Sequence, residues 1–138
     1  LVFGRPTSVD NGTPRDITIR MSGTNPVVTC SVPLSGAYTY RFDVEAQATN
    51  EVWKAAPFQV AANTIYATNS TLVVNARALQ QAGGGVVPLF TKSSGTFGDE
   101  INFRQIVLPP NSRLLGGEGS NYLSVEVGGR NGFVIRIR

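Results

Sequence analysis

The sequence contains no histidine and only one cysteine, Cys30, among its 138 residues. Histidine is the most common general base near neutral pH and the most common ligand of zinc, copper and haem iron. Its absence excludes both a Ser-His-Asp triad and a Cys-His pair. We therefore predict no catalytic, metal-binding or cofactor-binding residues and no cofactor, and we expect that the protein is not an enzyme.

A single cysteine also excludes a disulfide framework within the chain, so the sequence is not that of a small disulfide-stabilised domain. Along residues 27–32, Cys30 shares one face of a predicted strand with Val28 and Val32. This pattern indicates a small apolar core residue rather than a reactive thiol.

Charged residues are scarce as well. They make up 15% of the chain, whereas about a quarter is typical of globular domains, and the net charge is +3. The sequence has no lysine-rich run, zinc-finger spacing or aromatic RNA-binding motif, which argues against nucleic-acid binding. No apolar run approaches the roughly 18 residues of a membrane-spanning helix, so no membrane contact is expected. A surface of Ser, Thr, Asn and Gln suits contact with other proteins.

What the sequence does contain is alternation of apolar and polar residues, which is typical of strands with one buried face. The longest example covers residues 38–46, and a second covers residues 16–21. The residues expected to face the core are Tyr38, Tyr40, Phe42, Val44 and Ala46 in the first, and Ile17, Ile19 and Met21 in the second. A change of parity near residues 104–105 suggests a β-bulge, with Ile106 and Leu108 facing inward after it.

The same alternation marks residues 122–127 and 133–138, which are joined by Gly-Gly-Arg-Asn-Gly. Asn-Gly tolerates the positive φ angles of tight turns, so we predict a C-terminal hairpin of these two segments. The apolar rows are Leu123, Val125 and Val127 in the first segment and Phe133, Ile135 and Ile137 in the second.

Residues 71–82 are the one place where a helix competes with a strand. Leu72, Val73, Ala76 and Leu79 share a helical face, and Gly83 is suited to ending a helix. The β-branched run at residues 71–74 fits a strand equally well. The pattern favours a short helix, while the strand remains an alternative.

Together these patterns predict one domain, residues 1–138, with an all-β fold of seven to nine short strands and at most one short helix, at about residues 71–82. The leading candidates are a β-sandwich of jelly-roll or immunoglobulin-like topology. Strand order cannot be derived from the pattern alone.

The chain resembles the jelly-roll cement, or decoration, proteins of tailed phages. The resemblance lies in the compact β-domain, the Thr- and Asn-rich strands and the IVLPPN run at residues 106–111 before the final hairpin. It implies a structural virion subunit on the capsid exterior, a homodimer or homotrimer that stabilises a shell by binding the major capsid protein.

The function we expect is therefore non-enzymatic assembly through protein contacts. An edge strand at the N-terminus and arginines near the C-terminus are the expected partner contacts, namely Leu1, Val2, Phe3, Arg5, Tyr122, Arg136 and Arg138. The alternative is a carbohydrate-binding or adhesin module. In that case Trp53, which is otherwise a core or interface residue, would stack against a glycan.

Overall fold

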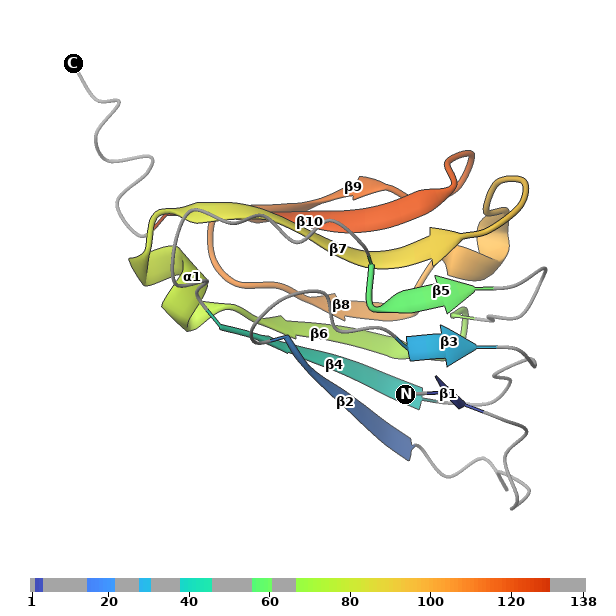
Figure 1. The fold of residues 1–138 in the computed structure, drawn as a ribbon, viewed down its shortest axis with the longest axis horizontal. Coiled ribbons are helices and arrows are strands. Elements are labelled where there is room, and N and C mark those ends of the chain that lie inside the picture. The colour runs from blue at the N-terminus through green and yellow to red at the C-terminus, as the bar shows by residue number, and fades with distance from the viewer. Residues whose placement is uncertain are drawn as a thin grey trace.

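The computed structural model describes residues 2–3, 15–21, 28–30, 38–45, 56–60 and 67–129 (Figure 1). This part of the chain forms two sheets, one with the strand order β1-β3-β5-β7-β10-β9 and one with the order β2-β4-β6-β8. The strands are β1 Val2–Phe3, β2 Arg15–Met21, β3 Val28–Cys30, β4 Tyr38–Val44, β5 Phe58–Val60, β6 Thr71–Asn75, β7 Gly84–Lys92, β8 Gln105–Val107, β9 Ser112–Gly116 and β10 Tyr122–Gly128. Two short helical segments, α1 (Arg77–Gln81) and the 3-10 turn η1 (Asp99–Ile101), lie between strands.

Consecutive strands from β1 to β8 alternate between the two sheets. Within each sheet, neighbouring strands pair in parallel. One sheet contains the pairs β1–β3, β3–β5 and β5–β7, and the other contains β2–β4, β4–β6 and β6–β8. In Figure 1, β5 and β7 point one way while β6 and β8 point the other. Each connection between neighbouring parallel strands therefore passes through the opposite sheet, so the chain winds in coils, as in a two-sheet β-solenoid.

The predicted all-β sandwich is thus confirmed, and the described part of the chain contains one short α-helix, α1. The described residues contain ten strands, slightly more than the seven to nine expected. Their parallel pairing differs from the antiparallel pairing of jelly-roll and immunoglobulin-like folds. Alternation along a strand predicts which face is buried, but it does not predict which strand lies beside it. The parallel strand order therefore could not be derived from the sequence.

The core lies between the sheets and is filled by a cluster of aromatic rings. Tyr40 and Phe42 of β4 contact Phe58 of β5 and Phe90 of β7, with ring centroids 5.6 to 5.8 Å apart. Phe58 and Phe90 stack at 5.0 Å, and Phe103 joins the cluster. The predicted inward rows are confirmed for Tyr38, Tyr40, Phe42 and Val44 of β4 and for Leu123, Val125 and Val127 of β10, which are all buried. Ala46, predicted to extend the first row, lies outside the described residues.

The segment predicted as a helix is divided between two elements. Residues 71–75 form β6, and α1 begins only at Arg77. Leu72 and Val74 are buried and lie in register with Tyr40 and Phe42 of β4. Pairing in the sheet therefore decides the conformation of the β-branched residues, and only the alanine-rich remainder is helical.

The first strand of the predicted C-terminal hairpin is confirmed as β10, but its predicted pairing with residues 133–138 is contradicted. β10 pairs along one edge with β7 and along the other with β9, both in antiparallel orientation. A strand has only two hydrogen-bonding edges, so β10 has none left for residues 133–138. Residues 133–138 themselves lie outside the described residues.

Candidate functional site

β8 lies at the end of the four-stranded sheet, and its outer edge has no partner strand among the described residues. The backbone N–H of Gln105 donates to the carbonyl oxygen of Ser70 at 3.4 Å, on the side of β6. Because successive residues of a strand direct their backbone groups to opposite edges, the N–H and C=O of Ile106 face away from β6. We refer to Gln105–Val107 as the β8 edge.

The side chain of Ile106 faces the interior of the sandwich and is nevertheless exposed. Ile106 is in register with Leu72, which is in register with Tyr40, and residues aligned in this way share one face of a sheet. Leu72 and Tyr40 are 0% exposed, whereas Ile106 is 44% exposed. The sandwich is therefore open at the β8 edge, where an inward-facing apolar side chain lacks a cover.

Val107 adds apolar surface on the opposite face of the same strand and is also 44% exposed. A short strand with free backbone groups and exposed apolar side chains is the type of edge that pairs with another chain.

The prediction that Ile106 points to the inner face of the sheet is thus correct, but its side chain is exposed and not buried. The predicted bulge at residues 104–105 is replaced by the η1 turn and the irregular residues that follow it.

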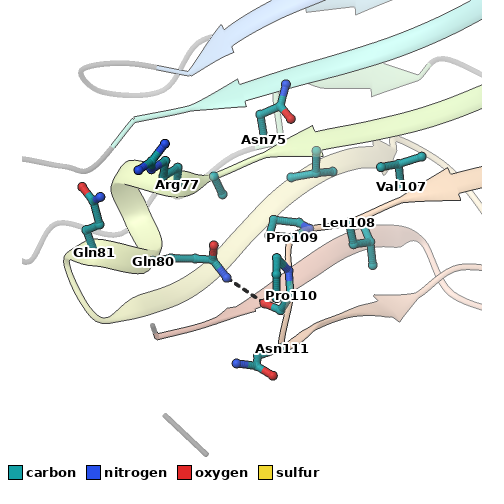
Figure 2. Close-up of a pocket in the computed structure, with 11 residues that line it drawn as sticks. Asn75, Arg77, Gln80, Gln81, Val107, Leu108, Pro109, Pro110 and Asn111 are labelled. Carbon is teal, nitrogen blue, oxygen red and sulfur yellow. Dashed lines mark hydrogen bonds between the residues drawn. The ribbon is translucent and has the colours of Figure 1, made fainter. Parts of the chain in front are cut away.

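A pocket of about 510 Å³ opens at the end of the β8 edge. It lies between the end of β6, helix α1 and the connection from β8 to β9 (Figure 2). The residues lining it are Val74, Asn75, Ala76, Arg77, Gln80, Gln81, Val107, Leu108, Pro109, Pro110 and Asn111. Val107 belongs both to the pocket and to the β8 edge, so the two features are continuous.

The pocket walls combine amide groups with apolar surface. Gln80 donates from Nε2 to the carbonyl oxygen of Pro110 at 2.7 Å, which ties α1 to the β8–β9 connection (Figure 2). Asn75 donates from Nδ2 to Oδ1 of Asp43 at 2.9 Å. The lining side chains therefore offer hydrogen-bond donors, hydrogen-bond acceptors and hydrocarbon surface.

Of the partner contacts predicted from the sequence, Val2 and Phe3 form β1, the terminal strand of the six-stranded sheet, as expected. Tyr122 is 43% exposed at the start of β10. Leu1, Arg5, Arg136 and Arg138 lie outside the described residues, as does Trp53, on which the carbohydrate alternative depended. Of the predicted contacts that are described, Val2 and Phe3 lie on β1 at one end of the six-stranded sheet, whereas Tyr122 lies on β10, next to the strand at the other end.

Sequence reasoning missed the β8 edge as a site. Residues 106–108, Ile-Val-Leu, form an unbroken apolar run directly before two prolines. Such a run on a short strand is a signal for an edge with both faces apolar, although periodicity alone does not distinguish it from a buried strand.

Comparisons with known proteins do not assign the chain to a family. No family model, curated protein or solved structure matches the chain. Among the described residues, no helix is long and apolar enough to span a membrane, and no group of three or more His, Cys, Asp or Glu residues could hold a metal ion.

Proposed function

We propose that this protein is a non-enzymatic assembly subunit that binds other protein chains through the β8 edge. The observation that carries the proposal is the exposure of Ile106. Its side chain faces the interior of the sandwich, yet the residues aligned with it, Leu72 and Tyr40, are fully buried. A strand added beside β8 would pair with the backbone groups of Ile106 that face away from β6 and would cover this side chain.

The partner in this proposal is another copy of the chain or a larger shell protein. A virion, with the subunit on the capsid exterior, is the setting suggested by the resemblance to decoration proteins. The β-sandwich architecture supports this setting, whereas the parallel pairing departs from the jelly roll of those proteins. Each bound copy would stabilise the shell because its contacts must break before shell subunits separate.

Ile106→Lys tests the proposal. A lysine in the interior of the joined sandwich would bury an unpaired charge, which costs several kcal/mol. We expect the wild type to show a mass above 14.7 kDa that rises with concentration in size-exclusion chromatography with light scattering. The variant should have a dissociation constant at least about 100-fold higher.

Val86→Lys is the matched control. Val86 of β7 is 42% exposed, close to the 44% of Ile106, but it lies beside the fully buried Val87 and so faces away from the core. It should associate like the wild type. A wild type that stays monomeric at all concentrations and binds no other protein during purification would contradict the proposal, as would equal effects of the two lysines.

A further inference from the structure

The β8 edge places specific demands on the strand that joins it. One face of that strand must be apolar to cover Ile106, and the other must tolerate solvent beside Val107. Residues 133–138, Phe-Val-Ile-Arg-Ile-Arg, have this pattern, with Phe133, Ile135 and Ile137 forming the apolar row. Arginines on the remaining row suit a face in contact with water.

Both edges of β10, the strand that precedes this segment, are already paired, one with β7 and the other with β9. The described chain ends at Gly129, at the same end of the sandwich as the β8–β9 connection. The N–H of Gly128 donates to the carbonyl oxygen of Asn111 at 2.9 Å, so this connection lies directly against the end of β10.

The strand order indicates whether the strand that joins the β8 edge comes from the same chain or from a second copy. Residues 108–111 connect β8 to β9, and β9 lies beyond β10 in the six-stranded sheet. To reach the free side of β8 from the end of β10, the same chain would have to cross this connection at the same end of the sandwich. Crossed connections of this kind are avoided in folded proteins.

We propose that residues 133–138 of a second copy add to the β8 edge as a further strand and cover Ile106 with their apolar row. This inference rests on the proposed assembly function and names its partner segment. The pocket at the end of the β8 edge then accommodates one end of the incoming segment, because Val107 lines both features.

Disulfide trapping between separate copies tests this inference. One full-length variant carries Ile106→Cys, and three others carry Phe133→Cys, Ile135→Cys or Ile137→Cys. Cysteines on adjacent strands with Cα atoms roughly 4.4 to 6.8 Å apart can be bridged. After mild oxidation, we expect a mixture of the Ile106→Cys chain with one of the three others to give a covalent dimer. Each variant oxidised alone measures the background from Cys30.

A second pair of variants keeps the test independent of disulfide geometry. Ile135→Lys should leave the protein monomeric in light scattering, whereas Val134→Lys, on the opposite row, should associate like the wild type. A bridge that forms only within one chain, when Ile106→Cys and one C-terminal cysteine are combined, would overturn the inference.

The outcome also separates this inference from the proposed function. If Ile106→Lys abolishes association while no C-terminal cysteine forms a dimer and Ile135→Lys has no effect, the β8 edge binds a different segment and the inference fails alone. If the wild type neither associates nor binds another protein, both fail.

Discussion

Replacing Phe90 by alanine is expected to lower the free energy of unfolding by about 3 to 5 kcal/mol. Phe90 of β7 is 0% exposed, and its ring lies between the two sheets. It contacts Tyr40, Phe42, Phe58 and Phe103 at centroid distances of 5.0 to 5.8 Å. Truncation removes the hydrophobic transfer energy of the ring and leaves a cavity whose rigid aromatic walls cannot collapse fully.

Urea denaturation followed by far-UV circular dichroism gives this free energy. Tyr122→Ala is the control, because Tyr122 is also aromatic but is 43% exposed on β10. We expect the control to change the free energy by about 0.5 kcal/mol or less. Equal losses in the two variants would show that the ring cluster is not the centre of the core.

Gly84→Ala is expected to destabilise the protein by about 1 to 3 kcal/mol more than Gly83→Ala. Both glycines have positive φ angles, +86° for Gly84 and +111° for Gly83. Alanine pays about 1 to 2 kcal/mol for such a conformation at either position. Only at Gly84 would the added Cβ collide with backbone, namely with the carbonyl oxygen of Val127 and with the nitrogen of Gly129 at 2.8 Å.

The comparison isolates the close approach of two backbones at this point. Gly84 begins β7 and pairs with Gly128 at the end of β10, whereas a Cβ at Gly83 meets nothing within 4 Å. Thermal unfolding of the two variants side by side measures the difference. Indistinguishable transitions would mean that β7 and β10 are not in this register at their ends.

The strands with strict alternation were predictable from the sequence. Tyr40 and Phe42 alternate with polar neighbours, and both are fully buried as expected. Residues 71–75 were harder, because Leu72 and Val74 fit a helical face as well as a strand, and only pairing with β4 decides between them. Local pattern thus predicts the buried face, while nonlocal pairing decides ambiguous segments.

The candidate site depends on information that a single sequence does not contain. The alternation of residues 122–127 predicted a strand correctly, yet its partners are β7 and β9 and not the next segment in the chain. Likewise, the parity of Ile106 predicted an inward side chain, but its exposure follows from the position of β8 at the end of a sheet. Strand order determines both outcomes.

Amide hydrogen exchange at Ile106, measured as a function of protein concentration, tests most directly whether another chain pairs with the β8 edge. If another chain pairs with the β8 edge, the exchange of this amide should slow as concentration rises, whereas that of Ser94, which is exposed after β7, should stay fast. An Ile106 amide that exchanges as fast as that of Ser94 at every concentration, or that is protected equally at all concentrations, would show that no other chain pairs with the β8 edge.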